Sequence, residues 1–187
     1  MVEIISLGLD GVFEIRPPKF ADERGFFSET WNAAKLAQAG ITVDFVQDNH
    51  SCSRGRGVMR GLHFQTPPFA QDKLVRVLRG SVFDVAVDIR KGSPTYGRWV
   101  GIELSAEAWN QILVPKGFAH GFVTLELDTE VVYKVSAPYS QPHDRSVRFD
   151  DPAIAIDWPV QAAEMTLSAK DSAAPLLAEI ETGFVYP

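Results

Sequence analysis

The chain of 187 residues contains one cysteine, and no apolar run in it approaches the roughly 20 residues that a membrane-spanning helix needs. The lone Cys52 excludes an intrachain disulfide, and residues 1–8 lack the basic start and long apolar core of a secretory signal. Basic residues are outnumbered, and the net charge of −6 disfavours general nucleic-acid binding because phosphates would be repelled. We therefore expect a cytoplasmic protein that binds neither membrane nor nucleic acid.

Strand signals dominate the chain. Hydrophobic residues make up 45% of it and no stretch resembles an interdomain linker, so residues 1–187 are expected to form one domain. Five segments rich in β-branched and aromatic residues are predicted to be strands: 73–79, 81–89, 98–104, 118–127 and 130–135. Many short strands with close turns predict a mainly β sandwich or barrel.

Helix signals are few. One helix is predicted over residues 31–39, with Thr30 as its N-cap and Gly40 as its stop, and a second near residues 175–180. The tail from Asp151 onward is richer in proline and alanine and less strand-like than the rest.

Two histidines lie in glycine-containing, strand-like stretches, His63 in 57–65 and His120 in 115–122. A ring in such a place can point into a closed pocket, where desolvation and nearby charges set its pKa. Residues 54–79 hold six basic side chains and one acid, a patch that suits a small anion such as a diphosphate. The same patch equally fits solvated strand edges and loops.

Two polar residues alternate with valines on predicted strands, Lys73 on 73–79 and Tyr133 on 130–135. A buried polar group without a partner costs on the order of 1–3 kcal/mol, so each needs a partner or a ligand. Taken alone, the simpler interpretations are a lysine that reaches solvent at the rim and a core tyrosine with its hydroxyl at the rim.

The pattern Pro-x-Gly-x-x-His at 115–120 resembles the second half-motif of cupin barrels, and the glycine-rich run into His63 resembles the first. Metal-binding cupins supply His-x-His and a carboxylate from the first motif, whereas this chain has His63, Phe64 and Gln65 with no glutamate at the usual distance. Two imidazoles and an amide are a poor ligand set for zinc or iron. We expect a cupin-like barrel without a metal.

Nine segments in order resemble the dTDP-4-dehydrorhamnose 3,5-epimerase family of dTDP-sugar epimerases, which acts in L-rhamnose synthesis. The segments are 22–29, 47–51, 57–65, 71–75, 84–90, 115–122, 133–134, 151–152 and 158–159. The resemblance implies a cupin-type double-stranded β-helix (jelly-roll) barrel with a few short helices, without metal or cofactor. It also implies a homodimer that exchanges N-terminal strands and acts on a dTDP-linked 4-keto-6-deoxy sugar.

The family's reaction fits these residue types. A ketone at C4 acidifies the protons at C3 and C5, so inversion needs a base, an acid on the opposite face and a cation for the enolate oxygen. The resemblance assigns these roles to His63, Tyr133 and Lys73. The family's Ser-x-Lys-Asp segment corresponds to 168–171, which makes Asp171 the carboxylate that orients His63. Sequence alone would favour Asp171 as a helix N-cap.

The resemblance also implies a set of substrate contacts: Arg24, Glu29, Gln47, Asp48, Asn49, Arg60, Lys73, His120, Asp144 and Lys170. Tyr139 is either a stacking platform for the base or an ordinary loop tyrosine. Asp144 stands where the family has glutamate, so its contact would come from a shorter arm. Arg24, Phe26 and Glu29 are expected to serve the partner's site, although Phe26 equally fits interface packing.

Arg60 and His63 are three residues apart and would face opposite sides of a regular strand, yet the resemblance puts both at the substrate. We predict an irregularity at Gly61, because glycine within a strand often marks a bulge. Cys52 is expected to be a spectator.

Three functions stay open from the sequence: epimerisation at C3 and C5, epimerisation at only one of these carbons, or sugar binding without catalysis. The presence of Tyr133 favours the first. A non-catalytic module should have lost the base, the acid or the carboxylate, and none is lost.

Overall fold

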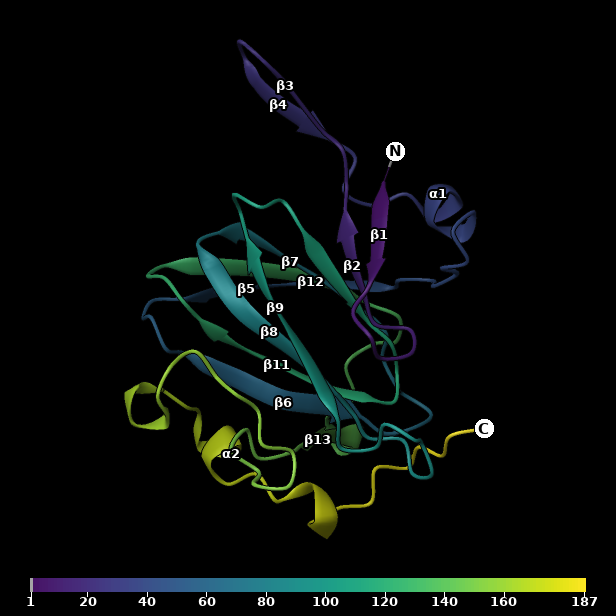
Figure 1. Cartoon of the computed structure of the whole chain (residues 1–187), viewed down its shortest axis with the longest axis vertical. Helices are drawn as coiled ribbons and strands as arrows, with labels where there is room; N and C mark the ends of the chain where they lie inside the picture. Colours follow the sequence, from purple (N-terminus) through teal and green to yellow (C-terminus); the bar gives the residue numbers. More distant parts are fainter. Residues whose placement is uncertain (1) are drawn as a thin grey trace.

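Two antiparallel sheets face each other and enclose a barrel, and the five predicted strand segments correspond to β7, β8, β9, β11 and β12 within them (Figure 1). The computed structural model describes residues 2–187. The six-stranded sheet has the order β1 (Glu3–Ser6), β2 (Phe13–Arg16), β10 (Gln111–Val114), β7 (Lys73–Arg79), β12 (Thr129–Val135), β5 (Gln47–Ser53). The five-stranded sheet has the order β13 (Asp144–Ser146), β6 (Met59–Gln65), β11 (Phe118–Thr124), β8 (Ser81–Asp88), β9 (Trp99–Ser105). The predicted mainly β, cupin-like jelly roll is confirmed.

The period-two alternation of each strand divides its side chains between the barrel interior and an outer layer. Val75 of β7 and Val82 and Ala86 of β8 meet inside the barrel and are fully buried. Val85 and Val87 point to the opposite face of β8 and belong to a second apolar cluster. Both faces of the five-stranded sheet are therefore covered, which fixes its register because a slip by one residue would exchange the two sets.

The C-terminal part of the chain supplies the outer layer. It lies along the outer face of the five-stranded sheet (Figure 1), where Ile154 and Leu177 pack against the cluster that contains Val85. Its short elements are η2 (Ala162–Glu164), α2 (Ala169–Ser172) and η3 (Leu177–Glu179), and η1 (Gln141–His143) lies between β12 and β13. No helix within residues 2–187 is long and apolar enough to cross a membrane.

The helix predictions need correction. The first helix, α1 (Ala33–Ala37), is shorter than 31–39, and its N-cap is Asn32 rather than Thr30, because the Asn32 side chain accepts a hydrogen bond from the Lys35 amide at 3.1 Å. The predicted helix near 175–180 is a single 3₁₀ turn.

Strand β6 contains the predicted irregularity at Gly61. The pairing between β6 and β11 shifts register between His120 and Phe122, and Gly61 has φ +127°, a conformation that favours glycine. A Cβ at Gly61 would lie 2.5 Å from the Cα of Gly121, so the two strands approach too closely for any other residue. As a result Met59 and Leu62 both point outward, and the side chains of Arg60 and His63 share the inner face.

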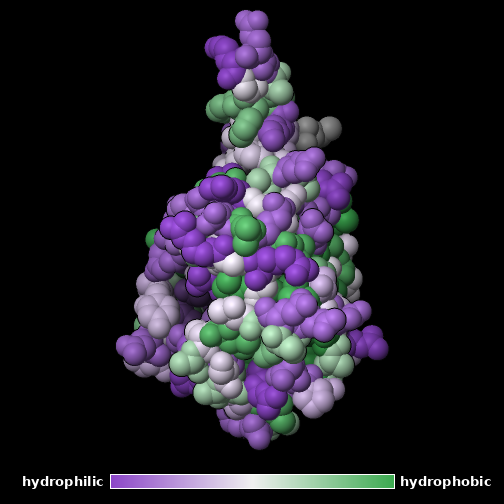
Figure 2. Space-filling model, turned by 90° about the vertical axis from the view of Figure 1, so that its left-hand side faces the viewer, coloured by the Kyte–Doolittle hydropathy of each residue, from purple (hydrophilic) through white to green (hydrophobic). Residues whose placement is uncertain are grey.

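Strands β3 (Lys19–Asp22) and β4 (Gly25–Ser28) form a hairpin that projects from the barrel. Figure 2 shows it as a narrow extension that carries hydrophilic and hydrophobic residues. Phe20 and Phe27 are 62% and 70% exposed. At the base, the indole N–H of Trp109 donates to the Ser28 hydroxyl at 2.9 Å.

Candidate active site

A cavity of about 610 Å³ opens between the two sheets and is lined by β5, β6, β7, β11, β12 and β13 together with helix α2. The four side chains predicted to be catalytic, His63, Lys73, Tyr133 and Asp171, all line it. His63 comes from the five-stranded sheet, whereas Lys73 and Tyr133 come from the six-stranded sheet. A ligand between the sheets would therefore have His63 on one side and Tyr133 on the other.

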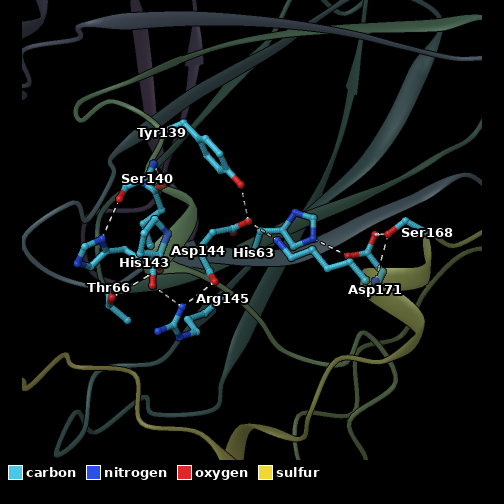
Figure 3. A network of polar contacts seen from close by, with 12 residues as sticks. His63, Thr66, Tyr139, Ser140, His143, Asp144, Arg145, Ser168 and Asp171 are labelled. Carbon is cyan, nitrogen blue, oxygen red and sulfur yellow. Dashed lines mark hydrogen bonds and ion pairs between the residues drawn. The ribbon is translucent and has the colours of Figure 1, made fainter.

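His63 and Asp171 form an imidazole–carboxylate pair (Figure 3), with Nε2 of the ring 2.5 Å from Oδ1 of the carboxylate. The Asp171 side chain is 4% exposed and the His63 side chain 32%, so the ring is the accessible member of the pair. Burial alone would raise the pKa of Asp171, but hydrogen bonds from His63 and Ser168 hold it below its usual value. The carboxylate is therefore charged and can stabilise a protonated His63.

Asp171 is not a helix N-cap, because Ser168 occupies that position of α2. The Ser168 hydroxyl accepts a hydrogen bond from the Asp171 amide at 3.1 Å and donates one to Oδ2 of the same residue at 2.9 Å. These two bonds leave Oδ1 directed at His63. The helix start thus orients the carboxylate.

Lys73 is buried and its ammonium donates to the carbonyl oxygen of His63 at 3.2 Å. Burial lowers the pKa of Lys73 to about 8, against the attraction of Asp84 and Asp144. A lysine in this state is mainly cationic at neutral pH and poorly hydrated, which suits stabilisation of a developing oxyanion. The simpler interpretation, a lysine reaching solvent at the rim, is therefore wrong.

Tyr133 stands on β12 directly opposite Val75 of β7, with its neighbours Val131 and Val135 buried in the barrel. Burial raises the pKa of the Tyr133 phenol, and the charge of Arg60 opposes that rise. The hydroxyl consequently keeps its proton at neutral pH and can donate it into the cavity.

His120 forms a second imidazole–carboxylate pair, with Asp84, which the sequence reasoning missed. Nε2 of His120 lies 2.8 Å and 3.0 Å from the two carboxylate oxygens of Asp84, and both side chains are buried. The signal in the sequence was an acid inside an apolar strand, at the parity of Val82 and Ala86, which point into the barrel.

Three polar side chains meet at the edge of the cavity, and Figure 3 shows the carboxylate at their centre. Asp144 of β13 accepts a hydrogen bond from the Tyr139 hydroxyl at 3.2 Å and forms an ion pair with Lys170 at 2.5 Å. The backbone N–H of Tyr139 donates to the side chain of Gln47 at 3.1 Å. Tyr139 itself is 59% exposed, so its ring presents an open aromatic face beside the cavity.

The remaining predicted contacts divide into two groups. Arg60, Gln47 and Asn49 line the cavity. Asp48 lies on the opposite face of β5, where it pairs with Lys134 at 2.8 Å. Arg24 pairs with Asp22 in the projecting hairpin, and Glu29 pairs with Lys35 of α1. These last three predicted contacts are not brought to the cavity by their own chain.

The basic patch predicted over 54–79 is dispersed by the fold. Arg60 and Lys73 line the cavity, whereas Arg54 pairs with Asp128 at 3.2 Å on the surface. Arg56 lies 3.8 Å from Glu164. Only two of the six cations therefore contribute directly to the site.

Gln65, the residue at the cupin ligand position, is fully engaged by the protein. Its amide N–H groups donate to the carbonyls of Phe69 and Pro138, and its oxygen accepts from the Ser140 amide at 2.6 Å. Within residues 2–187 no group of three or more His, Cys, Asp or Glu side chains is placed to hold a metal ion. Gln65 therefore holds residues 138–140 in place through its hydrogen bonds. The expectation of a metal-free site stays a prediction.

The jelly-roll barrel and a cavity holding a carboxylate-paired imidazole, a protonated phenol and a buried ammonium define an acid–base enzyme of the cupin type. The chain belongs to the dTDP-4-dehydrorhamnose 3,5-epimerase family, whose model matches residues 6–179. The resemblance seen in the sequence is thereby confirmed.

Individual relatives agree with this assignment. A dTDP-4-dehydrorhamnose 3,5-epimerase from Sinorhizobium fredii is 54% identical over 97% of this chain and 92% of its own. The solved structure of dTDP-6-deoxy-D-glucose-3,5-epimerase from Legionella pneumophila, in complex with dTDP-4-keto-L-rhamnose, is 46% identical over 100% of both chains, with a TM-score of 0.95. A 3'-monoepimerase from Streptomyces bikiniensis is 34% identical, with a TM-score of 0.87 over 93% of this chain and 87% of its own.

Proposed function

We propose that the protein epimerises dTDP-4-dehydro-6-deoxy-D-glucose at C3 and C5 to give dTDP-4-dehydro-L-rhamnose, in the biosynthesis of dTDP-L-rhamnose. The observation that carries this proposal is the placement of His63 and Tyr133 on facing sheets, with the Lys73 ammonium in the same cavity. Inversion at carbon requires a proton to leave one face and another to arrive at the opposite face. The higher identity to the 3,5-epimerases supports two inversions rather than one.

The first half of each inversion is proton removal. Nε2 of His63 is taken by Asp171, so Nδ1 is the nitrogen that removes the proton from C3 or C5. The electron pair of the broken C–H bond moves into the ketone, whose C4 oxygen becomes an enolate. The Lys73 ammonium stabilises that oxygen, and Asp171 stabilises the imidazolium.

The second half is reprotonation from the other side. The electron pair of the enolate takes the proton of the Tyr133 hydroxyl, the C4 ketone re-forms, and Tyr133 is left as a phenolate. The phenolate regains a proton from water and His63 releases its proton to water, so the site returns to its starting state. Each inverted carbon therefore carries a hydrogen derived from solvent.

The nucleotide occupies the outer part of the site in this proposal. Arg60 and Lys170 neutralise the diphosphate, and the exposed ring of Tyr139 stacks on the thymine. Lys170 pairs with Asp144 in the protein alone, so diphosphate binding competes with that ion pair. Asp144, one methylene shorter than the family's glutamate, keeps its contact to Tyr139.

A homodimer that exchanges its N-terminal hairpin would complete the site. Arg24 and Glu29 lie outside the cavity of their own chain, and the hairpin exposes Phe20 and Phe27 to solvent. Light scattering tests the dimer. Mixing inactive Arg24→Ala and His63→Ala proteins tests the exchange, since a heterodimer would regain one intact site, and no regain of activity would contradict it. We also propose that the protein is cytoplasmic and that it forms a single domain. Cell fractionation tests the location, and a single cooperative unfolding transition is expected of one domain.

Incubation with dTDP-4-dehydro-6-deoxy-D-glucose in heavy water, followed by NMR, tests the activity. Deuterium at both C3 and C5 with the L-rhamno product supports the proposal. Deuterium at one carbon would show a single epimerisation, and no incorporation would refute both. His63→Ala should abolish incorporation because the base is absent. Activity lost on chelation and restored by one divalent ion would contradict the metal-free site.

A further inference from the structure

Asp84 is a buried carboxylate whose one hydrogen-bonding partner among residues 2–187 is His120. It stands in the middle of β8 between apolar residues, has no exposed surface, and its two oxygens contact only Nε2 of His120. A buried charge is costly unless it is paired and hydrogen-bonded. An apolar side chain would fit the strand pattern at this position, so the carboxylate calls for an explanation.

The contact to Asp84 fixes the state of the His120 ring. Burial lowers the pKa of His120, against the attraction of Asp84, and the nearby charges of Lys73 and His63 lower it further. A neutral ring carries one proton, and the contact with a carboxylate places that proton on Nε2. Nδ1 is then an acceptor only. It makes no hydrogen bond to residues 2–187 and is not sealed from the cavity that the ring lines.

Asp84 also acts on Lys73. The ammonium of Lys73 has one hydrogen bond, to a neutral carbonyl oxygen, and its negative surroundings come first from Asp84 and then from Asp144. Asp144 already holds Lys170 and Tyr139 at the edge of the cavity. The charged and titratable groups around Lys73 are Asp84, Asp144, Lys170, His63, His120 and Tyr133.

We propose that Asp84 is a positioning residue that acts through two neighbours: it fixes His120 as an Nε2–H tautomer whose Nδ1 accepts a hydrogen bond from a sugar hydroxyl, and it keeps the Lys73 ammonium charged for the enolate. The second half of this proposal rests on the proposed epimerisation. The first half concerns the protein alone and stands or falls independently.

The tautomer is measured without substrate. Long-range ¹H–¹⁵N spectra of the histidine-labelled protein distinguish the protonated nitrogen of each ring, and His120 is assigned by the signals lost in His120→Gln. A neutral ring with its proton on Nε2 is expected. An imidazolium, or a proton on Nδ1 at neutral pH, would overturn the proposal even if the protein is an active epimerase. The expected spectrum does not depend on which substrate the enzyme uses.

The charge is tested with Asp84→Asn, which keeps an acceptor for Nε2–H and removes the charge. The pKa of Lys73 should fall by about one unit from its value of about 8, moving the alkaline limb of kcat to lower pH. The loss of rate from this cause then grows from about twofold at pH 7 to about eightfold at pH 8.5. If the alkaline limb of kcat in Asp84→Asn lies at the same pH as in the parent enzyme, the proposed role of Asp84 is refuted.

Asp88→Asn is the matched control. Asp88 is an equally buried carboxylate on the same strand, but it holds Arg90, Ser93 and Thr95 away from the cavity. It should change thermal stability while leaving the alkaline limb in place. If Asp84→Asn does not fold, Asp84→Ser, a smaller uncharged replacement, takes its place in the same pH profile, and the tautomer of His120 is still measured in the parent enzyme.

Discussion

Replacing Asp171 by asparagine should invert the protonation of His63, because the structure dictates which way the new amide points. The Ser168 hydroxyl accepts the amide N–H of residue 171 and donates its own hydrogen to Oδ2. That donor requires an oxygen, so the asparagine would present its oxygen to Ser168 and its NH₂ group to Nε2 of His63. Nε2 then accepts, and the proton moves to Nδ1, the nitrogen that must act as base.

The size of the effect follows from the cost of restoring the productive tautomer. With Nε2–H facing an NH₂ group, one hydrogen bond worth about 1.5 kcal/mol is lost and a buried donor is left unsatisfied at about 2.5 kcal/mol. The sum of about 4 kcal/mol corresponds to roughly a thousandfold loss of rate, since each 1.36 kcal/mol is about tenfold. Loss of the charge that stabilises the imidazolium adds to this loss.

The assay is the rate of deuterium incorporation into substrate at saturating concentration, with the fold checked by circular dichroism. The second variant, Asp171→Asn with Ser168→Ala, removes the hydroxyl that orients the amide, which can then turn its oxygen toward His63. It should recover at least about tenfold of the rate. Ser168→Ala alone should lose at most about tenfold, the value of one hydrogen bond. A double variant no faster than Asp171→Asn would refute the tautomer argument.

Three further predictions follow from the same geometry. Tyr133→Phe should lower product formation by about 10²-fold or more while His63 still exchanges substrate protons on its own face, seen by NMR as deuterium without inversion; a normal yield of inverted product would rule out Tyr133 as the acid. kcat should fall above about pH 8, because burial lowers the pKa of Lys73 to about 8 and the neutral amine cannot stabilise the enolate. A kcat that does not change up to pH 10 would contradict this. Gly61→Ala should lower the melting temperature by about 5 °C or more, because the added Cβ would lie 2.5 Å from the Cα of Gly121 on the facing strand. Gly97→Ala, with open space around it, should lower the melting temperature less. Equal falls in melting temperature would show that backbone conformation alone matters.

The fold could be predicted from local pattern because its strands alternate over most of their length. The segment 73–79 is confirmed to the residue, and 118–127 ends earlier, at Thr124, because its last residues turn toward β12. The helix start was misplaced by two residues. Trp31 packs edge-on against Phe45 at 4.7 Å instead of beginning the helix, which is a tertiary contact that propensity does not contain.

The site was only partly predictable for a related reason. The irregularity at Gly61 could be deduced because two required side chains conflicted with strand parity, and the structure resolves the conflict there. Asp84 was overlooked because an acid within an apolar run carries no sign of its partner until β11 is placed beside β8. Asp48 shows the reverse case, since parity alone places it on the face of β5 opposite Gln47 and Asn49, away from the cavity that holds His63.

The two imidazole–carboxylate pairs of this cavity share their chemistry and differ in burial, and burial decides what each can do. The His63 side chain is 32% exposed, so its proton can pass to water after each turnover, while Asp171 stabilises the charged ring. The His120 side chain is 7% exposed and lies near two other cationic or basic groups, so its charged form is disfavoured. A buried ring that stays neutral cannot cycle a proton, but it can hold a hydroxyl in one orientation. Exchange of the two roles would require His120 to become as exposed as His63.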